Sequence, residues 1–143
     1  MIISIASDHA GYELKEIIKN YFDMNDITYT DFGTHSTESV DYPVYAKKVC
    51  ASIQTGESDF GVLVCGTGIG MCIAANKHRN IRAACCHDTF SAKMSRLHND
   101  ANVITMGSRV IGSGLALDIL KKFLATDFEG GRHSERLSMY DSM

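Results

Sequence analysis

The chain has 143 residues, enough for one domain with a substantial core, and its 45% hydrophobic and 22% charged residues are typical of a soluble globular protein. Fourteen basic and 17 acidic residues give a net charge of −3, which excludes a general attraction to nucleic acid or to an anionic membrane. We therefore expect neither as a partner, and any anionic ligand must be held by a local cluster of donors.

The sequence shows no signal peptide and no membrane span. Residues 1–8 lack a basic region and reach an acid at Asp8, and no apolar run approaches the ~18 residues of a membrane helix. The five cysteines are odd in number and have no paired spacing, which indicates reduced thiols. We expect a cytoplasmic protein without a disulfide framework, and without a bound metal or cofactor.

Apolar and amphipathic segments alternate along the chain. We predict strands over residues 2–6, 27–32, 60–65, 81–85 and 102–106, and helices over about 14–22, 43–53, 69–78, 88–98 and 116–124. Pro43 suits a first helical turn, and Asp88 is a candidate N-cap. A short helix can follow the Gly130-Gly131 break.

This order predicts an α/β fold, a three-layer α/β/α sandwich around a five-stranded parallel sheet of the Rossmann-like kind. The apolar run 60–65 favours a sheet that is covered on both faces. We expect a single domain over residues 1–143. The polar segment of about 127–143 is expected to leave the core and to reach a partner subunit.

The glycine-rich stretch after the third predicted strand is the strongest single signal of a site. Ligands of open parallel sheets bind outside the carboxyl ends of the strands. Gly66, Gly68 and Gly70 let backbone N–H groups face an anion at the start of a helix, either a phosphate or a developing enediolate oxygen. A dinucleotide fingerprint would need its third glycine at Met71, and no Walker A lysine follows. A purely structural turn is the alternative.

Cys65 stands directly before this glycine loop. The positive end of a helix favours a thiolate, which can act as a base or as a nucleophile. The alternative is a small buried apolar residue. Cys50, Cys72 and Cys85 are better explained by core packing.

Histidine and arginine side chains elsewhere are weaker candidates. His9 follows the first strand, and His98 closes a helix, where a favourable interaction with the helix dipole is the simpler explanation. Arg132 and Arg136 are four residues apart and share one helical face, which suits a phosphate dianion. The alternative is a solvated basic face beside Glu129 and Glu135.

Taken together, the motifs resemble those of the type B ribose-5-phosphate isomerases, a family that includes subunits of galactose-6-phosphate isomerase and an allose-6-phosphate isomerase. The resemblance covers essentially the whole chain. It rests on six motifs in the same order, namely Ser7-Asp8-His9-Ala10-Gly11, Asp41-Tyr42-Pro43, Cys65-Gly66-Thr67-Gly68-Ile69-Gly70, His98-Asn99 with Ala101-Asn102-Val103, Gly107-Ser108-Arg109-Val110-Ile111-Gly112, and Gly131-Arg132-His133 with Arg136.

The resemblance implies an aldose–ketose isomerase of ribose 5-phosphate and ribulose 5-phosphate that needs no cofactor, with allose 6-phosphate and galactose 6-phosphate as alternative substrates. It implies homodimers or tetramers whose active sites are shared between subunits. By the same resemblance, Cys65 is the base between C2 and C1, and Thr67 and His98 open the sugar ring with help from Asp8. The other implied positions contact the substrate: Gly66, Gly68, Ile69 and Gly70 at the enediolate, His9, Arg109, Arg132 and Arg136 at the phosphate, and Tyr42 and Asn99 at the sugar.

Two readings from other classes stay open at this point. A non-catalytic sensor of phosphosugars or nucleotides would need Arg132 and Arg136 but not Cys65. A nicotinamide-dependent dehydrogenase would need a glycine pattern that this loop only approaches.

Overall fold

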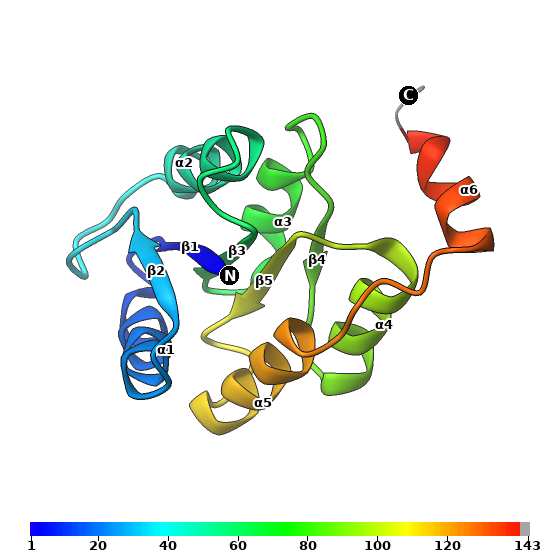
Figure 1. Cartoon of the computed structure of the whole chain (residues 1–143). Coiled ribbons are helices and arrows are strands. Elements are labelled where there is room, and N and C mark those ends of the chain that lie inside the picture. The colour runs from blue at the N-terminus through cyan, green and yellow to red at the C-terminus, as the bar shows by residue number, and fades with distance from the viewer. Residues whose placement is uncertain (141–143) are drawn as a thin grey trace.

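The computed structural model describes residues 1–140, in which strands and helices alternate up to the last two helices (Figure 1). The strands are β1 (Ile2–Ser7), β2 (Thr28–Asp31), β3 (Phe60–Cys65), β4 (Ala83–Cys85) and β5 (Val103–Gly107). The helices are α1 (Tyr12–Met24), α2 (Tyr42–Gln54), α3 (Ile69–Ala75), α4 (Thr89–Asn99), α5 (Ser113–Leu124) and α6 (Arg132–Ser138).

All strand pairs are parallel, in the order β2-β1-β3-β5-β4. The chain moves from β1 to one side to form β2 and then to the other side to form β3. The strand order therefore reverses between β1 and β3. In open α/β sheets this reversal is where the loops diverge and leave room for a ligand.

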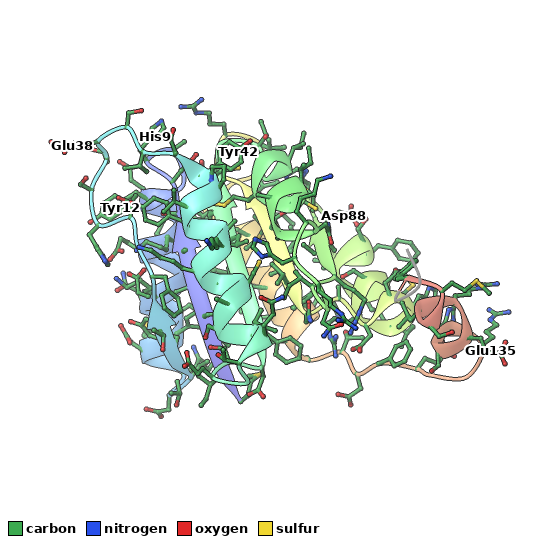
Figure 2. All side chains as sticks on the ribbon, turned by 90° about the horizontal axis from the view of Figure 1, so that it is seen from above. His9, Tyr12, Glu38, Tyr42, Asp88 and Glu135 are labelled. Atoms are coloured by element: carbon green, nitrogen blue, oxygen red, sulfur yellow. The ribbon has the colours of Figure 1, made fainter. Side chains whose placement is uncertain are left out.

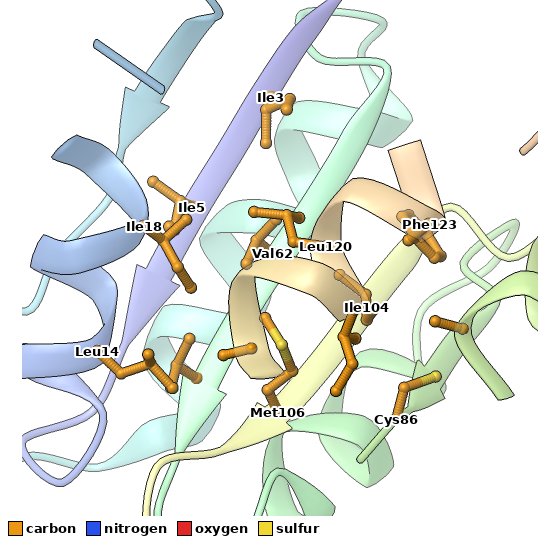
Figure 3. Packing of buried hydrophobic residues seen from close by; sticks show 14 of the residues in the cluster. Ile3, Ile5, Leu14, Ile18, Val62, Cys86, Ile104, Met106, Leu120 and Phe123 are labelled. Atoms are coloured by element: carbon orange, nitrogen blue, oxygen red, sulfur yellow. The ribbon is translucent and has the colours of Figure 1, made fainter. Parts of the chain in front are cut away.

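Helices cover both faces of the sheet, as predicted. On one face α1, α4 and α5 pack against Ile3, Ile5, Val62, Ile104 and Met106, all fully buried (Figure 3). On the other face α2 and α3 pack against alternate residues of the same strands, among them Leu63 and Cys65. This alternation is the period-two pattern of a strand, and both of its faces are buried here. Cys65 consequently lies on the α2–α3 side.

Both predicted helix starts are confirmed. Pro43 lies in the first turn of α2, and the Asp88 carboxylate accepts a hydrogen bond from the Ser91 N–H (2.7 Å) at the start of α4. Helix α1 departs in one respect from a simple apolar stripe facing the sheet. Ile17 is exposed, whereas Lys15 is fully buried because it pairs with Asp31 at the end of β2.

Two predicted boundaries are wrong around β4. Helix α3 ends at Ala75 rather than near His78, and β4 begins at Ala83 rather than at residue 81. Between the two elements the Asn76 amide donates to the Ala83 carbonyl (2.9 Å) and accepts from the Ala83 N–H (2.9 Å). The Asn76 side chain thus pairs with the outer edge of β4 at its first residue, whereas the apolar pattern predicts a strand that begins two residues earlier.

Helix α6 lies beyond α4, apart from the sheet, and packs against α4 (Figure 1). Most of its surface is exposed, while His133 is buried. Within residues 1–140 no helix combines the length and the apolar character that crossing a membrane requires. The proposed reach of the segment 127–143 to a partner stays a prediction, and residues 141–143 lie outside the described residues.

Candidate active site

The loop after β3 places a thiol under a backbone donor. Cys65 is the last residue of β3, and its Sγ accepts a hydrogen bond from the Gly68 N–H (3.1 Å). The residue is 5% exposed, so bulk water has little access to the sulfur. Thr67, one residue before Gly68, is exposed, and its hydroxyl accepts from the Ile69 N–H (3.3 Å). The loop therefore presents a shielded sulfur and an exposed hydroxyl two residues apart in the sequence.

Position 68 of this loop accommodates only glycine. The residue has φ of +77°, and a Cβ there would lie 2.8 Å from the Met106 carbonyl carbon and 3.0 Å from the Cys85 sulfur. Its carbonyl accepts from the Thr105 hydroxyl (2.9 Å). The left-handed conformation and the close approach of the Met106 backbone explain why the sequence has glycine here.

Hydrogen bonds hold the loops that follow β1 and β5 next to the end of β3. The Asp8 N–H donates to the Val64 carbonyl (3.1 Å), and its carboxylate accepts from the Gly11 N–H (3.0 Å). A Cβ on Gly11 would lie 2.4 Å from the Val64 carbonyl oxygen. The Ser108 hydroxyl donates to the Ala10 carbonyl (2.7 Å). Buried Asp8 is thus held next to the end of β3.

Three further predicted residues border these loops. The Tyr42 ring lies against Gly70, since a Cβ there would come 2.8 Å from its Cζ. His9 accepts at Nδ1 from the Val40 N–H (3.2 Å). The Arg109 N–H donates to the Gly66 carbonyl (3.0 Å), and its side chain lies over Gly66. We call the group at this edge the loop site: Asp8, His9, Tyr42, Cys65, Gly66, Thr67, Gly68, Ile69, Gly70 and Arg109.

The other predicted residues lie elsewhere. Helix α4 begins after the carboxyl end of β4 and ends before the amino end of β5, so its last residues, His98 and Asn99, lie at the opposite edge of the sheet. Eleven residues of helix span about 16 Å. Arg132 and Arg136 are exposed on α6, which packs against α4. We call His98, Asn99, Arg132 and Arg136 the helix site.

The separation of the two groups is visible across the molecule. In Figure 2, His9 and Tyr42 lie toward one end of the fold, and Glu135 of α6 lies at the far end. One chain therefore assembles the loop site and the helix site in different places.

A compact side-chain cluster surrounds His98. Its ring stacks on that of His133 with centroids 4.3 Å apart and an interplanar angle of 14°. The Glu129 Oε2 lies 3.5 Å from His133 Nε2 and 3.9 Å from His98 Nε2. Burial lowers the pKa of His133, and nearby His98 and Arg132 lower it further, against the opposing effect of Glu129. Among the described residues these three form the one group with a metal-ligand arrangement.

Sequence reasoning missed the parts played by Ser108, Glu129 and His133. Ser108 follows the fifth strand, which is a usable signal for a loop residue at the ligand-binding edge. Glu129 and His133 are four residues apart, a spacing that indicates side-chain contact within one helix, but Glu129 precedes α6. Their approach to His98 comes from the tertiary fold, so no local pattern reveals it.

The other four cysteines lie outside the loop site. Burial raises the pKa of the Cys50 and Cys86 thiols to about 11. Cys72 and Cys85 are half-buried, and burial raises the pKa of each, with their mutual interaction adding to that of Cys72. These four thiols are therefore held in the protonated form at neutral pH.

The carboxyl edge thus joins a shielded sulfur, a buried carboxylate and a glycine loop at a helix start. This is the equipment of an α/β enzyme that moves protons on a small anionic substrate. Residues 3–140 match the family model described as Ribose/Galactose Isomerase. This chain belongs to that family, and it is a sugar-phosphate aldose–ketose isomerase.

Individual relatives are similar over nearly their whole length. Ribose-5-phosphate isomerase B of Escherichia coli is 45% identical over 135 residues, which cover 94% of this chain and 91% of that protein. D-erythrulose-4-phosphate isomerase of Pectobacterium atrosepticum is 43% identical over 143 residues, covering 97% and 94%. The solved ribose 5-phosphate isomerase of Thermotoga maritima is 53% identical with a TM-score of 0.98, covering 99% and 98%.

Proposed function

We propose that this chain interconverts ribose 5-phosphate and ribulose 5-phosphate, with Cys65 moving the proton between C2 and C1. The thiolate removes the C2 proton, and the electron pair forms the double bond of an enediolate. The O2 proton passes to O1, and the thiol returns its proton to C1. No atom or electron is gained or lost overall. The observation that carries this proposal is the shielded Cys65 sulfur, which accepts the Gly68 N–H.

Residues of both sites suit the earlier step, because a furanose ring must open before C2 becomes acidic. In the proposal, Thr67 and His98 exchange protons with the ring and anomeric oxygens, and Asp8 orients the sugar hydroxyls. Backbone N–H groups of the loop Gly66, Gly68, Ile69 and Gly70 face the enediolate. His9, Arg109, Arg132 and Arg136 bind the phosphate, and Tyr42 and Asn99 contact the sugar.

We further propose that each active site is shared by two copies of the chain. The helix site lies at the opposite edge of the sheet from Cys65, so within one chain it serves no loop site. Apolar side chains are exposed on α2, α3 and the start of α4, next to the loop site, which favours their cover by another copy. These are Val44, Ile69, Ile73 and Phe90.

The test is turnover by the purified chain with metals chelated. Ribose 5-phosphate is compared with allose 6-phosphate, galactose 6-phosphate and D-erythrulose 4-phosphate, the last because a relative is named for it. We expect ribose 5-phosphate to give the largest kcat/KM. A larger value for another sugar phosphate would keep the chemistry and replace the substrate.

The matched variants are Cys65→Ala and Cys50→Ala. Loss of a general base reduces kcat by about a thousandfold, whereas Cys50 is a buried thiol in α2 whose pKa of about 11 leaves it protonated. We expect the first variant to be inactive while folded and the second to be active. Activity retained in Cys65→Ala would exclude this cysteine as the base.

A further inference from the structure

His98, Glu129 and His133 form a cluster of three potential metal ligands. A lone histidine that interacts with a helix dipole needs no such neighbours. One ring nitrogen of each imidazole and one Glu129 carboxylate oxygen lie within 4.8 Å of one another. Ligand atoms of a tetrahedral zinc site lie about 3.3 Å apart, as the usual bond lengths near 2 Å imply. The 3.5 Å and 3.9 Å separations from Glu129 are close to that value.

An independent observation singles out His133. Its side chain is 7% exposed, and its Nε2 is buried without a hydrogen-bond partner among the described residues. Leaving a buried polar nitrogen unpaired costs about 1–3 kcal/mol. The nitrogen lies on the Glu129 side of the ring, where a ligand would relieve this cost.

The backbone fixes the three side chains relative to one another. The Glu129 N–H donates to the Leu97 carbonyl (3.0 Å), which ties the segment before α6 to the last turn of α4. The His133 N–H donates to the Gly130 carbonyl (3.1 Å). His98 and Glu129 are exposed enough to admit an ion from solvent, while His133 forms the floor.

We propose that His98, Glu129 and His133 bind a divalent transition-metal ion of the zinc class, such as Zn²⁺, Ni²⁺ or Co²⁺. Two imidazoles and one carboxylate match the ligand preferences of these ions, and with three protein ligands one position stays open to water. Exposed Arg132, next to His133, repels a cation, so the affinity is moderate and binding is reversible.

The binding has a consequence for catalysis, and this part rests on the proposed function. His98 cannot bind a metal through Nε2 and also use that nitrogen to exchange a proton with a sugar oxygen. The metal therefore competes with ring opening, and it inhibits rather than activates the isomerase.

Binding is measured first, without substrate. The full chain is titrated with Co²⁺ and followed by visible absorption, because thiolate ligands add an intense near-ultraviolet band that nitrogen and oxygen ligands lack. Equilibrium dialysis against Zn²⁺ gives the stoichiometry. We expect one ion per chain without a thiolate band. A thiolate band, or no bound ion at all, would overturn the proposal.

The decisive variants are Glu129→Gln and His133→Ala, with Glu135→Gln and His78→Ala as matched controls outside the cluster. We expect at least a tenfold weaker Co²⁺ affinity for the first two and no change for the controls. Since Glu129 is largely exposed, its variant tests the site even if His133→Ala fails to fold. Equal affinities in Glu129→Gln and wild type would overturn the proposal.

The activity assay separates this inference from the proposed function. In the wild type, with the sugar phosphate well below its KM, the Zn²⁺ concentration that halves turnover is expected to equal the dissociation constant from dialysis and to rise at least tenfold in Glu129→Gln. Unchanged inhibition in that variant would overturn the competition. A chain that binds Co²⁺ as described but turns over no sugar phosphate would overturn the proposed function and leave the metal site standing.

Discussion

The loop site and the helix site are built in opposite ways. The loop site rests on the buried ends of β1, β3 and β5, and backbone groups approach so closely at Gly11 and Gly68 that no side chain fits. The helix site consists of side chains at the end of α4 and on the short α6, and its arginines are exposed. The backbone therefore fixes the atoms of the loop site, whereas the positions of the helix-site atoms depend on side chains and on the packing of α6 against α4.

The largest effect is expected from mixing inactive chains. If each active site is shared as proposed, one of the two sites in a Cys65→Ala and Arg132→Ala heterodimer keeps both its cysteine and its arginine. Random exchange of two such dimers restores about one quarter of the wild-type activity, because half of the dimers are mixed and each has one intact site. The measurement is turnover after subunit exchange of the two purified variants.

The control mixture is Cys65→Ala with Arg109→Ala. Both positions belong to the loop site, since the Arg109 side chain lies over Gly66, so neither site of the mixed dimer is intact. We expect no recovery. Equal recovery in both mixtures, or none in either despite proven mixed dimers, would contradict the division into two sites.

The rigidity of the loop site is tested by Gly68→Ala and Gly130→Ala. Both glycines have positive φ, +77° and +71°, but only Gly68 has backbone within 3 Å of a Cβ. Strain alone costs about 1 kcal/mol, and the added clash raises the loss at Gly68 to about 3 kcal/mol. Urea denaturation measures both. Equal losses would mean that the loop adapts, and that its rigidity is overstated.

Asp31, the last residue of β2, joins this strand to α1 through Lys15 and Lys19. Burial alone would raise the pKa of this carboxyl, but hydrogen bonds from Lys15 and Lys19 and from the Gly33 N–H hold it below its usual value. Solvent screens part of the network, so Asp31→Asn is expected to lose about 2 kcal/mol at pH 7, less than a fully buried pair.

The pH dependence has a definite sign. A carboxyl with a lowered pKa in the folded state stabilises the protein above its unfolded pKa, and this contribution disappears as the pH falls below about 4 toward the folded value. The stability difference between wild type and Asp31→Asn should therefore shrink in that range. Glu135→Gln on α6 is the control with little effect at either pH. A difference independent of pH would exclude the charge as its cause.

The smallest effect concerns the edge of the sheet. Asn76→Ala removes two hydrogen bonds to Ala83 and should cost about 1 kcal/mol, because water replaces them at a partly exposed position. Thermal denaturation measures the loss. Asn76→Asp, which keeps the acceptor but not the donor, should lie between alanine and wild type; a larger loss for aspartate would show that charge rather than pairing matters there.

Much of the fold follows from the sequence because its signals are local. The alternation of apolar strands and striped helices predicts all five strands and the layers, and Asp88 and Pro43 mark two helix starts. Burial of Lys15 depends on Asp31 sixteen residues away, and the backbone of Ala83 in β4 pairs with the side chain of Asn76, the residue after α3. Such pairings across the fold leave no periodic trace.

The same distinction applies to the candidate site. Cys65 and its glycine loop are recognisable because strand, turn and helix start follow one another in sequence. The position of His98 cannot be recognised in this way, because it depends on the direction in which α4 runs back along the sheet. This direction places His98 at the edge opposite Cys65 and close to Glu129 and His133.

The Asn76 amide has a consequence for how copies of this chain can meet. An uncovered strand edge is a template on which another chain can add a strand, and sheets that continue from one molecule to the next arise in this way. Here a side chain already occupies the donor and the acceptor of Ala83. Another strand therefore cannot pair with β4 at that residue. Copies that meet at this edge would contact one another through side chains. Such contacts can form an assembly of defined size, whereas strand addition can continue indefinitely.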